Sequence, residues 1–234
     1  MQCPVCHAEN DRFAVVCTAC RAFLQNRVPN LDLFSTAWQV IEQPAEAFRR
    51  ITLAEHKNYA FLLYALAGIG VSFTGMSVVR AGERVDSLLE VLFWGLLIGI
   101  PAGVILAPLV SVIHWGLARM AGGRSTFRVS LGVSAYALVP VVLSVLLVLP
   151  VEVLTFGMYL FTHNPSPMTI KPVLYLVLLG FDGALVLWSL VLLAVGTSVG
   201  HQVPAFRSAF LAGVLGGGVL AGLYAAAVAA ARAF

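Results

Sequence analysis

Beyond residue 57 the chain alternates between long uncharged apolar stretches and short polar connections that carry most of its charges. A helix needs roughly 20 residues to cross about 30 Å of hydrocarbon. Continuous apolar runs favour helices over a membrane barrel, whose strands alternate between apolar and polar residues. The pattern therefore predicts an all-α polytopic membrane protein with a five-helix transmembrane bundle. The predicted spans are 58–79, 91–118, 129–151, 183–206 (with a start near Pro172) and 208–231.

Spans two and three are longer than a straight crossing requires, and both contain prolines. Proline removes a helical hydrogen bond, and neighbouring helices can satisfy the carbonyl group that it frees. We therefore expect kinks at Pro101, Pro108, Pro140 and Pro150. The segment Val153–Thr162 either ends span three or dips back into the membrane, and the pattern leaves both open.

Composition and charge narrow the class of protein. Hydrophobic residues make up 60% of the chain and charged residues 11%, whereas about a quarter of residues are charged in soluble proteins. A net charge of +3 is too small to indicate a nucleic-acid partner, so the partner that composition implies is the lipid bilayer. Seven Lys and Arg residues flank the spans on the N-terminal side and four on the other. This bias predicts a cytosolic N-terminus and, with five spans, a C-terminus outside.

All four cysteines lie in the first twenty residues, as two C-x-x-C pairs with ten residues between them. Zn²⁺ binds four thiolates in a tetrahedron, and a closed site of this kind is structural because it leaves no position for a substrate. The spacing predicts a zinc ribbon over residues 1–25; a redox dithiol and a metal-free ribbon are the alternatives. The expected ligands are Cys3, Cys6, Cys17 and Cys20.

Residues 26–57 join this ribbon to the transmembrane domain, residues 58–234. An apolar helical face precedes Pro44, which ends the helix. Such a face is typical of an amphipathic segment at the cytosolic membrane interface; packing against the cytosolic loops of the bundle is the alternative. The face consists of Leu31, Phe34, Trp38 and Ile41.

Asp182 is the acidic residue that lies well inside a span. At 1.5 Å per residue from Pro172 it lies roughly 15 Å deep, and an acid at that depth is a functional candidate. It serves either to hold two helices together through a hydrogen bond or as a proton or ion site. His114, near the cytosolic end of span two, lies too far away for a direct pair. Tyr136 and Ser144 of span three are its expected hydrogen-bonding partners.

The other acids of the spans, Glu90 and Glu152, are expected at the outer boundary as solvated surface charges. In span five, Gly218-x-x-x-Gly222 forms a face of small residues on which another helix can approach closely. It indicates packing within the bundle or, as the alternative, a homo-oligomer. Gly196–Gly200 matches the G-x-S-x-G motif, but a nucleophile elbow needs a strand before it. This segment ends an apolar helix, so we expect no enzyme activity.

Three blocks of the chain resemble the Yip family of five-span, Ypt/Rab-interacting membrane proteins. One runs from Gly122-Gly123 through Phe127 to the Tyr136-x-x-x-Pro140 element of span three. The others are Pro44–Ile51 and the stretch from Trp188 to Ala209. The likeness covers about residues 35–230. The N-terminal ribbon resembles that of prokaryotic members of the family, so we expect the protein in a prokaryotic cell membrane.

For eukaryotic members the resemblance implies work in vesicle traffic and binding of Rab GTPases. Their Asp-Leu-Tyr-Gly-Pro block is missing here, where Leu31–Phe34 is at best a remnant, so Rab binding is not carried over. The leading interpretation is a non-enzymatic scaffold whose ribbon recruits a cytosolic or membrane protein partner. The alternative is a small transporter or lipid-moving permease that uses Asp182, although no internal repeat of the transporter kind is present.

Overall fold

The computed structural model describes residues 1–11, 13–25, 28 and 30–233, and in these the chain is all-α, with isolated β-bridges in place of named strands. Five helical segments are long and apolar enough to cross a membrane, which confirms the predicted number. The spans are α3 (Ala60–Val78), α4 (Leu88–Met120), a composite third span (Phe127–Phe161), α9 (Pro172–His201) and α10 (Ala205–Ala233).

The third span is built from five consecutive helical pieces. Two of its breaks coincide with prolines: Pro140 lies in the first turn of α6 and Pro150 in the first turn of α7. A proline is well tolerated there because its missing N–H is one that helix starts leave unpaired. The pieces are α5 (Phe127–Ala137), α6 (Val139–Leu143), the π-helix η2 (Ser144–Val148), α7 (Leu149–Phe156) and the 3₁₀-helix η3 (Gly157–Phe161).

The prolines of span two behave differently, because α4 runs as one helix of 33 residues through Pro101 and Pro108. The segment that the sequence leaves undecided completes span three: α7 continues to Phe156, and η3 begins at Gly157, whose φ is +56°. Two further short helices lie near this end, η1 (Ala81–Glu83) and α8 (Pro167–Ile170).

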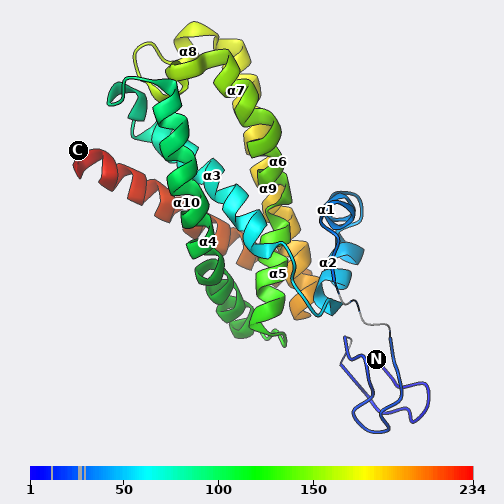
Figure 1. Ribbon diagram of the computed structural model, residues 1–234. Helices are drawn as coiled ribbons and strands as arrows, with labels where there is room; N and C mark the ends of the chain where they lie inside the picture. Colours follow the sequence, from blue (N-terminus) through cyan, green and yellow to red (C-terminus); the bar gives the residue numbers. More distant parts are fainter. Residues whose placement is uncertain (12, 26–27, 29, 234) are drawn as a thin grey trace.

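Figure 1 shows the N-terminal residues below one end of the bundle and α8 at the opposite end. We call residues 1–25 the cysteine module, the end of the bundle beside it the module end, and the end with α8 the far end. The spans run alternately between these ends, and the C-terminal turns of α10, in red, extend away from the other helices (Figure 1).

Helices α3 and α4 are packed backbone against backbone. A Cβ added at Gly103 would lie 2.1 Å from the Tyr64 carbonyl oxygen, and one at Gly68 would lie 2.3 Å from the Gly99 carbonyl oxygen. Glycine alone permits this approach, as is usual where membrane helices pack without a hydrophobic driving force. Span two therefore uses its glycines as the contact surface with span one.

The glycine face expected in span five is not part of the packing. A Cβ at Gly218 or at Gly222 would meet nothing within 4 Å, so the prediction of packing within the bundle is wrong for this pair. Gly216 lies on the packed side of α10 instead, where a Cβ would come 2.2 Å from Leu190 Cδ2. The face of Gly218 and Gly222 is open because α10 diverges from the other helices (Figure 1).

Two helices precede the first span, α1 (Leu33–Glu42) and α2 (Pro44–Leu53). Asp32 caps α1 by accepting a hydrogen bond from the N–H of Ser35, and Pro44 begins α2. Helix α2 belongs to the bundle: Phe48 is completely buried, and a Cβ at Gly196 of α9 would lie 2.9 Å from its ring.

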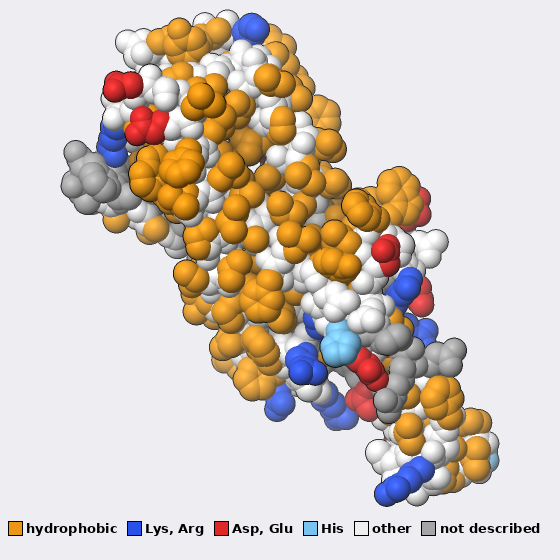
Figure 2. All heavy atoms as spheres, viewed as in Figure 1, with side chains coloured by type: hydrophobic (Ala, Val, Ile, Leu, Met, Phe, Trp, Pro, Cys, Tyr) orange, Lys and Arg blue, Asp and Glu red, His pale blue; other side chains and the backbone are white. Residues whose placement is uncertain are grey.

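The surface has the distribution of a membrane protein. Apolar side chains cover the middle of the bundle in Figure 2, while Lys and Arg gather at its two ends, most densely at the module end. Many large apolar side chains of the spans are exposed, among them Ile105 at 68% and Leu154 at 86%. Because lipid tails accept apolar surface, these residues contact the hydrocarbon of the bilayer.

Candidate metal centre and polar contacts of the bundle

The cysteine module consists of two turns with the same backbone pattern. In the first, the N–H of Cys3 donates to the Ala8 carbonyl and that of His7 donates to the Cys3 carbonyl, both at 3.0 Å. In the second, Cys17 donates to Ala22 at 2.8 Å and Arg21 to Cys17 at 3.0 Å. An isolated antiparallel bridge closes each turn. Local hydrogen bonds therefore build two equivalent knuckles, each presenting two thiols.

The four thiols converge on one point. Their sulfur atoms lie within 4.8 Å of one another, and the closest pairs, Cys3 with Cys20 and Cys6 with Cys17, are 3.6 Å apart. A tetrahedron with Zn–S bonds of about 2.3 Å has edges of about 3.8 Å, so the sulfur spacing fits such an ion. A disulfide would need about 2.05 Å. The four cysteines are therefore free thiols grouped as a possible metal site.

Backbone N–H groups favour the thiolate form of two of these ligands. The N–H of Cys20 lowers the pKa of Cys17 to about 6, and the N–H of Cys6 lowers the pKa of Cys3. The N–H of Ala22 lowers the pKa of Cys20, but its hydrogen bonds with the neighbouring thiols outweigh this effect and raise that pKa to about 12. Neighbouring thiolates disfavour one another, and a cation bound between the four sulfurs would favour the thiolate form of all of them.

Asn10 joins the two knuckles beneath the sulfurs. Its side-chain N–H₂ donates to the Ala8 carbonyl at 2.8 Å and to the Cys17 sulfur at 3.4 Å, and its oxygen accepts from the N–H of Thr18 at 2.9 Å. Contacts of this kind around the ligands orient a metal site. The spacing of the two C-x-x-C pairs predicts the cysteine ligands, but it does not reveal that Asn10 connects the two knuckles.

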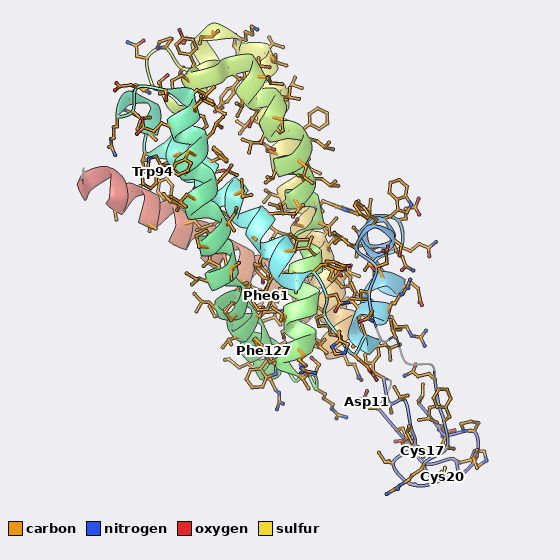
Figure 3. All side chains as sticks on the ribbon, viewed as in Figure 1. Asp11, Cys17, Cys20, Phe61, Trp94 and Phe127 are labelled. Atoms are coloured by element: carbon orange, nitrogen blue, oxygen red, sulfur yellow. The ribbon has the colours of Figure 1, made fainter. Side chains whose placement is uncertain are left out.

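The module also contacts the bundle. Gln202, the residue after α9, donates to both carboxylate oxygens of Asp11 at 3.2 and 3.1 Å. Figure 3 shows Asp11 on the side of the module toward the bundle, with Cys17 and Cys20 farther from it. Val28, three residues beyond the module, forms a parallel bridge with Ala54, just after α2. The possible metal site thus lies next to the module end.

Gly122 and Gly123, the glycine pair of the block that resembles the Yip family, form the turn between spans two and three. Gly122 has φ +93°, and Gly123 donates to the Ala118 carbonyl at 2.8 Å. A Cβ at Gly123 would lie 2.7 Å from that oxygen. The next residue, Arg124, donates to the carbonyl of His201 at the end of α9. Glycine is required here because the turn runs directly against two helix ends.

The two residues of the Tyr136-x-x-x-Pro140 element each shape the bundle, and Pro140 lies in the first turn of α6. Tyr136 is completely buried, and its hydroxyl donates at 2.9 Å to the carbonyl of Asn58, at the entrance to span one. It does not reach Asp182, so the expected pairing of these two residues is wrong. Sequence reasoning could not see this partner because the two residues are 78 positions apart.

His114 belongs to a buried cluster of histidines and hydroxyls at the module end. Its Nε2 lies 2.8 Å from the Thr197 hydroxyl, and its ring lies 5.0 Å from that of His201. His201 in turn is held between the hydroxyls of Ser125, at 2.6 Å, and Ser130, at 2.9 Å. The cluster ties spans two, three and four together.

Asp182 is half-buried and accepts a hydrogen bond from Ser144, the first residue of the π-helix, as the sequence predicts. Glu152 differs from its expected state: instead of a solvated surface residue it is 8% exposed. Glu90, by contrast, is exposed. Ser198 donates to the Val203 carbonyl at 2.9 Å, a helix-end contact rather than a catalytic one.

A five-span, all-α bundle that carries a thiol cluster at one end is a polytopic integral membrane protein with a possible metal site. The model of the Yip1 domain matches residues 38–227, and because this is most of the chain, the protein belongs to the Yip1 domain family. This is not an enzyme family. Neither a curated protein nor a solved structure matches the chain. The match begins at Trp38, so the cysteine module lies outside it.

Proposed function

We propose that this protein is a non-enzymatic scaffold that holds a zinc-binding module and an interfacial helix at the cytosolic surface of a prokaryotic cell membrane. The observation that carries the proposal is how the segment before the first span is built into the bundle. Helix α2 is buried through Ala47, Phe48 and Ile51, and it packs against α5 and α9. A flexible tether would bury none of these side chains.

Helix α1 supplies the surface of this scaffold. Val40 is completely buried, whereas Phe34 is 83% and Trp38 62% exposed, one turn apart on the same helix. Figure 1 shows α1 end-on beside the upright spans, so it lies across the bundle axis. Trp and Phe on such a helix insert among lipid headgroups. On this proposal α2 anchors the segment on the bundle, and α1 offers its aromatic side chains to the membrane interface.

The zinc-binding module would be the part that recruits a protein partner. Cys3, Cys6, Cys17 and Cys20 would hold one structural Zn²⁺, which organises a segment too short to fold on its own. Val5 and Phe23 are 68% and 61% exposed on the module, and exposed apolar side chains on so small a unit suit contact with another protein.

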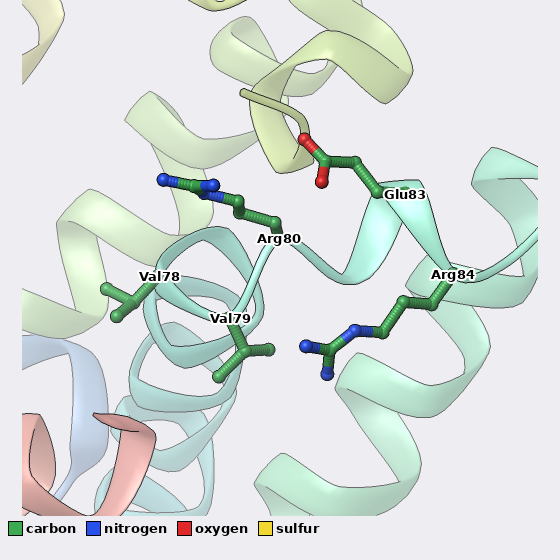
Figure 4. A pocket seen from close by; sticks show the side chains of 5 residues that line it. All are labelled: Val78, Val79, Arg80, Glu83 and Arg84. Carbon is green, nitrogen blue, oxygen red and sulfur yellow. The ribbon is translucent and has the colours of Figure 1, made fainter. Parts of the chain in front are cut away.

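The second candidate is a small transporter or lipid-moving permease, favoured by the bond between Asp182 and Ser144 within the spans. The bundle surface also has two hollows. One, of about 290 Å³, lies at the far end between Val78, Arg80 and Arg84 (Figure 4). The other, of about 180 Å³, lies at the module end beside Lys57 and Arg128. Asp182 lines neither of these two hollows.

Complementation of a deletion strain tests the proposal. A scaffold requires the module and α1, so Cys17→Ser and the double change Phe34→Ala, Trp38→Ala should each reduce complementation. The matched control is Phe93→Ala, which removes an aromatic that is 59% exposed elsewhere on the bundle. Asp182→Asn keeps an acceptor for Ser144 and should complement fully. A stable Asp182→Asn protein that fails to complement would overturn the scaffold and favour transport.

A further inference from the structure

The hollow of about 180 Å³ at the module end lies between the connection that leads into span one and the first turns of span three. The described residues that line it are Glu55, His56, Lys57, Arg128 and Leu131. Two permanent cations and a histidine therefore face one carboxylate among these residues, which gives the hollow a net positive charge. It lies at the end of the bundle where Lys and Arg gather most densely (Figure 2).

Packing brings Lys57 against the helix that carries Arg128. A Cβ at Gly132 of α5 would lie 3.1 Å from Lys57 Cδ, and Gly132 follows Arg128 by four residues, on the same face of the helix. Burial lowers the pKa of Lys57 to about 8, and the positive charge of Arg128 adds to this effect. Two cations that repel each other across a hollow are stabilised by an anion placed between them.

The polar and apolar residues of the hollow follow the order of a phospholipid. Lys57 precedes α3, which begins at Ala60, and Arg128 lies in the first turn of α5, so both cations lie at the depth where a span begins. Leu131 lies one turn farther along α5, towards the hydrocarbon. Thr126, the N-cap of α5, makes no side-chain hydrogen bond to the first turn, and a helix N-terminus favours nearby negative charge. A phosphate group at the rim would thus have its acyl chains beside Leu131.

We propose that this hollow binds the phosphate group of an anionic phospholipid, with Arg128 as the residue that donates hydrogen bonds to the phosphate oxygens. A guanidinium can donate two parallel hydrogen bonds to a phosphate. Lys57 contributes through its charge, because its ammonium already donates to three carbonyl groups. Basic pockets between membrane helices recognise lipid headgroups in the same way. The site does not depend on whether the bundle anchors partners or transports a substrate.

Lipid binding by the full-length protein in detergent tests the site. Anionic dioleoylphosphatidylglycerol and zwitterionic dioleoylphosphatidylcholine are titrated separately, and bound lipid is measured by native mass spectrometry. The anionic lipid should bind more tightly, and Arg128→Gln should weaken its binding roughly fivefold. Arg124→Gln is the matched control, because Arg124 is exposed at the same end of the bundle but is not a lining residue of the hollow. Lys57 is left unchanged because its substitution would also disturb the end of α2.

Equal affinity for the two lipids would overturn the proposal, and so would equal losses in Arg128→Gln and Arg124→Gln, which would show a general effect of surface charge. Inorganic phosphate separates a lipid headgroup from a free anion. At matched ionic strength it should leave the thermal unfolding midpoint unchanged, and stabilisation that Arg128→Gln removes would overturn the lipid assignment. Gel filtration of each variant verifies that it is folded. None of these measurements depends on complementation, so failure of this site is distinguishable from failure of the scaffold.

Discussion

At the scale of single residues, Lys57 places a largely buried charged group at the module end. Its ammonium donates hydrogen bonds to the carbonyls of Ile51, Thr52 and Ala54, and so completes the last turn of α2. Space for its side chain comes from Gly132, where a Cβ would lie 3.1 Å from Lys57 Cδ. Burial, and the positive charge of Arg128, lower its pKa from 10.5 to about 8.

This shift predicts a pH dependence of stability. Between about pH 8 and 10.5 the unfolded chain binds a proton at Lys57 that the folded protein has released, so stability rises with pH across this window. Below pH 8 Lys57 is protonated in both the folded and the unfolded state, so its contribution to stability is constant. Relative to Lys57→Met, the free energy of unfolding of the wild type should rise by on the order of 1 to 2 kcal/mol across the window, after screening by solvent. Thermal unfolding in detergent measures the gain, and Lys171→Met, exposed at the far end, is the control. An equal pH profile for wild type and Lys57→Met would contradict the prediction.

A second prediction at this scale concerns His7, which has φ +57° at the position where Arg21 has +58° in the other knuckle. Side chains with a Cβ are strained in this region, whereas glycine adopts it freely. His7→Gly should therefore retain the metal and stabilise the module by roughly 0.5 to 1 kcal/mol. His7→Val should weaken it. Resistance of bound metal to a competing chelator ranks the variants, and a Gly variant that loses metal faster than the wild type would refute this.

At the scale of elements, the contact between α3 and α4 depends on glycines. Gly103→Ala places a methyl group 2.1 Å from the Tyr64 carbonyl oxygen, so the two helices must separate. Overpacking of this kind costs roughly 1 to 3 kcal/mol. Gly116→Ala on the same helix meets nothing within 4 Å and should be neutral or stabilising. Thermal unfolding in detergent separates the two, and equal midpoints would show that the contact carries little stability.

At the scale of the whole molecule, zinc should organise the module without holding the bundle together. One zinc per chain is expected by metal analysis of protein purified without chelator. Cys3→Ser should abolish binding and raise amide exchange in residues 1–25, because four ligands are needed to close the site. The spans should stay inserted, since the side-chain bond between Asp11 of the module and Gln202 after α9 is exposed, and the spans pack against one another without it. Zinc-free protein with a fully protected module would contradict this.

The orientation of the whole molecule is predicted from its positive charges. Reporter fusions at Gly123 and Gln202 should behave as cytosolic, and one at Asn164 as external, because Lys and Arg are most numerous at the module end. The reverse pattern would place the module outside the cell.

The number of spans and the grouping of the cysteines followed from the sequence because both are local properties. Hydrocarbon offers no hydrogen-bond partners, so a spanning helix has to be long and continuously apolar in its own sequence. Each C-x-x-C pair likewise builds its knuckle from neighbouring residues. The bond between Ser144 and Asp182 was predictable because depth in the membrane can be counted along each span.

Only the tertiary structure decided which faces of the spans meet. Tyr136 was expected beside Asp182 but bonds to Asn58, and Glu152 was expected in solvent but is 8% exposed. Rotation of a helix about its axis sets these contacts, and in an apolar span the hydrophobic pattern is too uniform to define one. That rotation is fixed by close packing, such as Gly103 against Tyr64, and by breaks such as the π-helix at Ser144. Such contacts join residues tens of positions apart, which no single stretch of sequence reveals.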